Sequence, residues 1–172
     1  MNPNKHHQYG FTIVELLIVI VIVGILAAIS IVAYNGVMGK ANDAAVQQDL
    51  ANLSKKLEMY RTEKTGYPGT SGGIAVNLNS LNFKASKSAY RVVGLTTNLS
   101  YCFQSDNSSI YKVAARSKSG KSFYISNENS APQEIIGNPD CSALTPATDS
   151  AYMGYNTADT TTGPWRAWVG SN

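Results

Sequence analysis

One side chain in this sequence is placed to do chemistry at a membrane, and it is the carboxylate of Glu15. It follows the residues FTIV and stands directly before a long apolar run, residues 16–34. A charge at membrane depth costs a few kcal/mol and usually marks a function or a partner, whereas at the interface it is solvated by headgroups. The chain offers no cation at this depth. A cut after Gly10 would create an amine on Phe11, one helical turn from Glu15, for use by this chain or by a neighbouring copy.

Cys102 and Cys141 are the only two cysteines, and they lack the close spacing of a zinc site. If the polar part of the chain is exported across a membrane, it meets an oxidising environment that favours a disulfide between them. If it faces the cytoplasm, two free buried thiols are expected instead. Closing a loop of this length contributes about 4 kcal/mol in the chain-entropy model.

The residues needed for an enzyme are missing from the sequence. The only histidines are His6 and His7, and there is no G-x-S-x-G motif, no glycine-rich phosphate loop and no paired carboxylate site. We therefore expect no enzymatic activity, no cofactor and no metal site. Calcium binding near Asp149 and Asp159 is a weak alternative, because the tail has no dense D-x-D spacing.

The charge balance excludes a dedicated nucleic-acid binder. There are 14 basic and 11 acidic residues, and the formal net charge is +3. A mild basic cluster in the polar part is predicted to be a solvated sheet edge, with DNA binding as the weaker alternative; its members are Lys84, Lys87, Arg91, Lys112, Arg116, Lys118 and Lys121. No other feature of the sequence supports DNA or a host surface as a binding partner.

The apolar run predicts a membrane helix. Residues 16–39 contain no charged side chain, and the run at 16–34 would make about 28 Å of helix, close to the hydrocarbon thickness of a bilayer. A soluble core helix would carry a polar stripe, which this run lacks. A chain of 172 residues also has too little core to surround it.

Beyond Met38 the pattern stays helical but becomes amphipathic. Apolar residues recur at intervals of four and three, which predicts a narrow stripe packed on a sheet: Val46, Leu50, Leu53, Leu57 and Tyr60. The charged and polar residues are placed on the remaining surface: Lys40, Asp43, Gln47, Asp49, Lys55, Lys56 and Glu58. Gly66 and Pro68 end the pattern. The expected helix runs from Phe11 to about Lys64, a length of about 80 Å.

The remainder predicts an antiparallel meander lying on the amphipathic half-helix, an α+β fold. Residues 69–85 are expected to form a loop, and four strands are expected at 89–95, 99–104, 110–116 and 122–126. Short turns at 106–107 and 119–120 join the last three as antiparallel neighbours. The aromatic residues of the tail are expected to pack on the sheet, with an exposed adhesive site as the alternative: Tyr152, Tyr155, Trp165 and Trp168.

The stretch GFTIVELLIVIVIVGILAAISIVAYNG, residues 10–36, resembles the N-terminus of type IV pilins and of the related pseudopilins of type II secretion. The resemblance implies a pilin-like fold and a leader, residues 1–10, which a prepilin peptidase removes by cutting between Gly10 and Phe11. It implies N-methylation of Phe11, and pairing of the assembly residue Glu15 with the Phe11 amine of a neighbouring subunit. Residues 11–36 would be the transmembrane and filament-core helix, residues 37–65 its amphipathic half, and residues 66–172 the head.

These features predict a structural subunit of a type IV pilus for adhesion, motility or DNA uptake. One alternative is a pseudopilin of a type II secretion or competence system, and another is a single-span adhesin that never polymerises. The partners implied are other pilin subunits, the prepilin peptidase, the pilus assembly platform and membrane lipid before assembly. The subunit would lie in the inner or cytoplasmic membrane with its head exported, and then in an extracellular pilus.

One position departs from the family pattern. Many members carry a proline where this chain has Val32, and that proline helps the helix to loosen in the filament. Gly24 remains as a poor helix former at which some loosening is conceivable.

Overall fold

The protein is described here by a computed structural model, which divides the chain into two compact units, Met1–Val37 and Met38–Asn172. It describes residues 10–64, 66–68, 78–91, 97–103, 110–141, 150–156, 165 and 169–171. Residues 1–9 of the expected leader, the turn expected at 106–107, Asp149, Asp159 and Trp168 lie outside this set.

A single long helix, α1, spans Ile13–Lys64 and contributes to both units. It begins two residues later than predicted and ends where the sequence predicts, with Arg61 and Lys64 in its last turn, where basic side chains favour the helix dipole. The helix is continuous through Gly24 and Val32.

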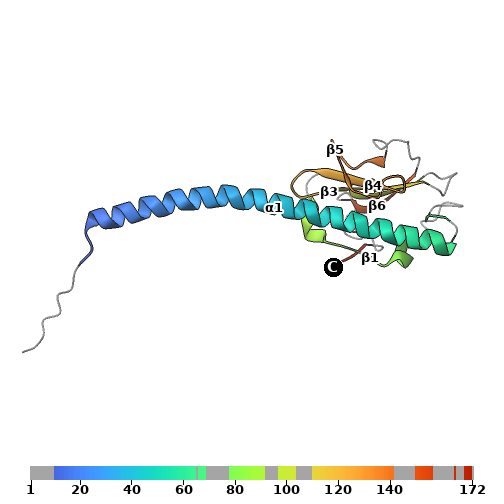
Figure 1. Cartoon of the computed structure of the whole chain (residues 1–172), viewed down its shortest axis with the longest axis horizontal. Coiled ribbons are helices and arrows are strands. Elements are labelled where there is room, and N and C mark those ends of the chain that lie inside the picture. The colour runs from blue at the N-terminus through green and yellow to red at the C-terminus, as the bar shows by residue number, and fades with distance from the viewer. Residues whose placement is uncertain are drawn as a thin grey trace, which may run out of the picture. The chain divides into compact units, whose positions relative to one another are not determined.

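The second unit contains the strands. After α1 the order is η1 (Leu78–Leu81), β1 (Phe83–Ala85), η2 (Lys87–Ala89), β2 (Thr97–Phe103), β3 (Tyr111–Arg116), β4 (Ser122–Ser126), β5 (Gln133–Ile135), β6 (Ser150–Asn156) and β7 (Val169–Ser171). Five of the strands form one antiparallel sheet in the order β5-β4-β3-β2-β6, and β1 pairs with β7 in parallel. Figure 1 shows the sheet beside the C-terminal part of α1.

The meander β2-β3-β4 forms because every second residue of its strands places an apolar side chain in the core. In β2, Leu99, Tyr101 and Phe103 belong to the core, while Ser100 and Cys102 face the opposite side. The turn between β3 and β4 uses Gly120 at φ +102°, a backbone conformation that a residue with a side chain rarely adopts.

The core lies between α1 and this sheet. The predicted stripe is confirmed: Val46, Leu50, Leu53 and Leu57 are fully buried, and Tyr60 packs on them while half-exposed. Each buried leucine contributes roughly 1.5–3 kcal/mol by leaving water. The α+β, pilin-like fold predicted from the sequence is therefore confirmed.

A coil, residues 137–141, covers the other face of the sheet. The hydroxyl of Ser100 donates to the carbonyl of Pro139 at 3.0 Å, and that of Ser122 donates to the carbonyl of Gly137 at 2.5 Å. A small second cluster lies between the sheet and this coil, where Cys102 and Ala114 of the sheet are buried together with Cys141 of the coil. Both faces of the sheet are therefore covered in this region.

Several predictions about local structure are wrong. The strand expected at 89–95 does not start at Ala89, because Ala89 ends η2 and Tyr90 makes one isolated bridge to Ser117. Residues 92–95 of that prediction lie outside the described residues. The loop expected at 69–85 contains η1 and β1. Asp49, expected on the polar surface, is 2% exposed.

Candidate assembly site

The N-terminus of α1 is fixed by a reciprocal pair of side chains, Thr12 and Glu15. The backbone N–H of Glu15 donates to the Thr12 hydroxyl oxygen at 3.2 Å. In return, the backbone N–H and the hydroxyl of Thr12 both donate to the Glu15 carboxylate at 2.8 Å. This T-x-x-E arrangement is a capping box, which satisfies donors that a helix start leaves unpaired.

The capping box gives Glu15 a local set of donors that the sequence interpretation missed. That interpretation looked for a cation, whereas the threonine three residues earlier supplies neutral donors instead. The T-x-x-E spacing in the sequence was a sufficient signal to find them. The Glu15 side chain thus caps the start of the helix, and it is still a candidate to pair with a cation of another subunit.

Gly10 and Phe11 lie before the helix, where a peptidase would need them. Both are exposed, Phe11 with 84% of its surface, and neither belongs to α1. The expected cut between them would leave Thr12 and Glu15 within the first five residues of the new chain.

The first part of α1 presents apolar side chains on every side. From Ile13 to Val37 all large apolar side chains are 51–84% exposed, and none contributes to a described core cluster. This far exceeds the apolar patch of a few hundred Å² that a soluble monomer tolerates. Among the described residues, α1 is the one helix whose length and composition allow it to cross a membrane.

In the second unit, the buried carboxylate of Asp49 ties α1 to the segment that follows β1. It accepts hydrogen bonds from the backbone N–H of Ser86 at 2.7 Å, from the Ser86 hydroxyl at 3.2 Å and from the Tyr90 hydroxyl at 3.1 Å. Burial raises the pKa of Asp49, and the three donors partly oppose this shift. The arrangement is a structural clasp inside the unit.

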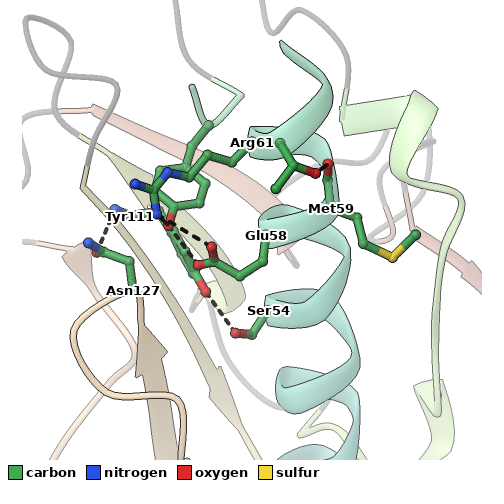
Figure 2. Close-up of polar contacts among 8 residues, drawn as sticks. Ser54, Glu58, Met59, Arg61, Tyr111 and Asn127 are labelled. Atoms are coloured by element: carbon green, nitrogen blue, oxygen red, sulfur yellow. Dashed lines mark hydrogen bonds and ion pairs between the residues drawn. The ribbon is translucent and has the colours of Figure 1, made fainter. Parts of the chain in front are cut away.

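Tyrosine hydroxyls make three further links between α1, its following coil and the sheet. The hydroxyl of Tyr111 on β3 bonds that of Ser54 on α1 at 2.7 Å, and Figure 2 shows these two side chains pointing toward each other. Tyr101 donates to the carbonyl of Pro68, and Tyr67 donates to Glu58 at 2.6 Å. Burial, followed by the Glu58 hydrogen bond, raises the pKa of Tyr67 to about 12. These groups hold the head to the helix.

Cys102 of β2 and Cys141 of the covering coil form a disulfide, with their Cα atoms 5.6 Å apart. The pair is buried beneath the coil, and the two residues are 39 positions apart. Of the aromatic residues in the tail, Trp165 packs edge-on against Tyr90 with ring centroids 5.2 Å apart. This agrees with packing rather than exposure for that one side chain.

The described part of the chain offers few other groups for chemistry. Among the described residues, there is no group of three or more histidine, cysteine or carboxylate side chains that could hold a metal ion. The members of the predicted basic cluster are distributed over several elements, from Lys84 on β1 to Lys121 beside β4.

Comparison with known families assigns the N-terminal segment. Residues 5–31 match the prokaryotic N-terminal methylation motif, and that motif leads here into a long helix carrying an α+β head. The chain belongs to the type IV pilin and pseudopilin family. As a pilin-like subunit it is a structural protein and not an enzyme.

Curated relatives of this pilin-like subunit carry the name type II secretion system core protein G. This chain is 33% identical over 95 residues to the protein of Aeromonas hydrophila. The aligned residues are 55% of this chain and 66% of that protein. The chain is 39% identical over 67 residues to that of Klebsiella pneumoniae, and 36% identical over 67 residues to that of Escherichia coli K12. These two alignments cover 39% of this chain and 48% and 46% of the relatives.

The pilin-like subunit thus spans about half to two-thirds of the curated relatives that it matches. A comparison with solved structures gives no match. The similarity to secretion proteins favours the pseudopilin alternative over the surface pilus that the sequence analysis placed first.

Proposed function

We propose that this chain is a pseudopilin of a type II-like secretion system, which polymerises through its N-terminal helix into a short filament. The observation that carries the proposal is the length of the alignments with core protein G, 67–95 residues for the relatives above. The N-methylation motif, at residues 5–31, is common to pilins and pseudopilins and cannot separate them. The longer alignments extend beyond the motif and therefore favour the secretion branch.

The exposed apolar surface of residues 13–37 explains how one helix serves two states. Before assembly it is stored in the inner or cytoplasmic membrane, with the head exported. During assembly the same surface leaves lipid and packs against the helices of neighbouring subunits. The Cys102–Cys141 disulfide supports export, because such bonds persist in oxidising compartments.

Glu15 selects the position at which a new subunit docks. In the stored subunit its carboxylate has the donors of Thr12. In the filament it pairs with the Phe11 amine of a neighbour, which the prepilin peptidase exposes by cutting after Gly10 and which is then N-methylated. Burying a carboxylate without a cation is expensive, so a subunit out of register is disfavoured.

Deletion of the gene in its own bacterium tests the proposal. The expected result is that folded proteins normally found in the medium accumulate inside the cell envelope, while filaments sheared from the surface are unchanged. Restoring the gene in trans should restore release. Loss of surface filaments with normal protein release would instead support a type IV pilus, and an effect on neither would support a non-polymerising adhesin.

Mass spectrometry and one substitution test the N-terminal chemistry. The mature chain is expected to begin at N-methylated Phe11. Glu15→Ala is expected to leave membrane insertion intact and to abolish assembly, whereas Glu63→Ala, an exposed carboxylate at the other end of α1, should assemble normally. An intact Met1, or normal filaments from Glu15→Ala, would contradict the assigned roles.

A further inference from the structure

The turn between β3 and β4, residues 117–120, gathers basic side chains at one end of the head. The backbone N–H of Arg91 donates to the carbonyl of Arg116 at 3.2 Å, and Tyr90 bridges Ser117. These contacts place the segment after η2 beside the end of β3. Lys118 lies in the turn and Lys121 follows it.

Two guanidinium groups converge on Gly120 in this turn. Arg116 donates from Nε to the Gly120 carbonyl at 3.3 Å, and Nη1 of Arg91 lies 3.5 Å from where a Cβ of Gly120 would stand. Burial, followed by the positive charge of Arg91, lowers the pKa of Arg116. Two cations this close favour an anion between or beside them.

The anionic partner is not supplied by the described part of the chain. Its ion pairs there are Arg61 with Glu58 and Lys121 with Glu134. Of the other acidic groups, Asp43 accepts a hydrogen bond from the hydroxyl of Ser119 in the turn itself. Among the described residues, no carboxylate pairs with the basic groups Lys40, Arg91, Arg116 and Lys118.

The turn is attached to α1 immediately after the apolar run. It contacts the helix at Asp43, and the position of a Cβ at Gly39 would be 3.7 Å from Cβ of Ser119. Gly39 follows the proposed membrane segment, 11–36, by three residues, about 5 Å of helix. If that segment lies in the bilayer, the three intervening residues limit how far Gly39, and the turn in contact with it, can lie from the headgroups, whatever the angle between the two units.

We propose that the β3–β4 turn, with Arg91 and Arg116, binds the phosphate groups of anionic phospholipids and so docks the head on the membrane before assembly. The inference rests on the proposed membrane storage of the subunit. Guanidinium groups bind phosphate with paired hydrogen bonds, and basic clusters beside a membrane helix are attracted to anionic lipid. Assembly would then require release of these headgroups.

The test uses the mature full-length chain in nanodiscs of phosphatidylcholine alone or of phosphatidylcholine with phosphatidylglycerol. Hydrogen exchange of the backbone amides of residues 117–121 is followed by mass spectrometry. Since each basic group near an anionic surface is worth about fivefold in binding, exchange should slow by about fivefold or more in the anionic discs. High salt should remove the difference.

Matched variants assign the effect to this turn. Arg91→Gln with Lys118→Gln should abolish the lipid-dependent protection, while Lys55→Gln with Lys64→Gln removes the same charge elsewhere and should preserve it. Lys118→Gln alone changes only an exposed side chain, and should reduce the protection even if the double variant folds poorly.

Three results would overturn the inference. One is equal exchange in both kinds of disc; another is equal protection by sodium phosphate in neutral discs, which would indicate a soluble anion. A third is protection that appears only as subunits associate, which would make the turn a subunit contact. If the chain inserts in both kinds of disc and its exchange does not depend on the lipid, this inference alone is contradicted. If the chain inserts in neither, the membrane storage on which the inference rests is contradicted.

Discussion

At the scale of single residues, Asp49 has the clearest consequence for the stability of the head. It lies on α1, yet it is buried and accepts hydrogen bonds from Ser86 and Tyr90, which follow it by 37 and 41 positions. Sequence periodicity assigned it to the solvent side because a charged residue is rarely buried without partners. No local sequence pattern around Asp49 predicts these two distant partners.

Replacing Asp49 by alanine should lower the free energy of unfolding by about 1–3 kcal/mol, because the Ser86 N–H and the Tyr90 hydroxyl lose a buried acceptor. Urea denaturation of the chain in detergent, followed by tyrosine fluorescence, measures the loss. Glu63→Ala, on an exposed position of the same helix, is the control and should stay close to wild type. Equal stability of the two variants would contradict the clasp.

The pH dependence of stability follows from the direction of the Asp49 shift. Burial raises the pKa of Asp49 in the folded chain above its value in the unfolded chain. The contribution of Asp49 to the free energy of unfolding is therefore complete below the pKa of the unfolded chain, and it is lost as the pH rises through the pKa of the folded chain. The stability of the wild type relative to Asp49→Asn should therefore decrease as pH rises from acid toward neutral. Unfolding curves at several pH values measure it, and a constant difference would refute the assignment.

At the scale of elements, the sequence predicts whatever depends on local periodicity. The charge-free run and the apolar stripe through Val46 and Leu57 define α1, and the alternation in residues 122–126 matches β4. The parallel pairing of β1 with β7 joins Phe83 to Val169, and no local pattern encodes such a distant partner. β6 was likewise not predicted, because its strand character depends on pairing with β2.

The candidate assembly site was predicted in part for the same reason. Gly10, Phe11 and Glu15 are adjacent in sequence and were selected together, although their proposed roles remain predictions. The Thr12 cap was not predicted, because the sequence analysis considered only a cation as the partner of Glu15 and not the neutral donors of a threonine one turn away. The basic turn was seen only as a diffuse cluster, since its contact with Gly39 and Asp43 is tertiary.

The start of α1 should depend on the Thr12 hydroxyl. Thr12→Val keeps the shape but removes the cap, at a cost of about 0.5–2 kcal/mol, and should increase hydrogen exchange in the first turn of the helix in micelles. Thr12→Ser retains a hydroxyl and should keep the turn protected. Equal exchange in the three proteins would show that the capping box does not stabilise the helix start.

The disulfide should stabilise the sheet by linking β2 to its covering coil. For a separation of 39 residues the chain-entropy model gives about 4 kcal/mol, so reduction should lower the melting temperature markedly. Calorimetry with and without reductant measures this. The double variant Cys102→Ser with Cys141→Ser should have a low melting temperature that does not change when reductant is added. Unchanged melting of the reduced wild type would contradict a stabilising role.

At the scale of the whole molecule, the two units have opposite relations to solvent. Of the residues that the structure describes, those buried in the core all lie within the second unit, from Val46 to Val169, while the first unit exposes its large apolar side chains. A subunit that is stored in lipid and then polymerised needs this division, because the surface that changes environment must not be the surface that maintains the fold.

A chain that starts at Met38 should therefore fold as a water-soluble head. It keeps the helix residues of the core, the five-stranded sheet and the disulfide, and it loses no buried residue. We expect a monomer in gel filtration without detergent, with a melting temperature near that of the full chain, since removal of exposed residues changes stability little. The matched control, a chain starting at Met38 with Leu53→Ala, should lose about 2–5 kcal/mol from the cavity that it creates. If the shortened chain aggregated or melted far below the full chain, the first unit would have to contribute to the fold of the head, and its exposed apolar surface could not be reserved for lipid and neighbouring subunits.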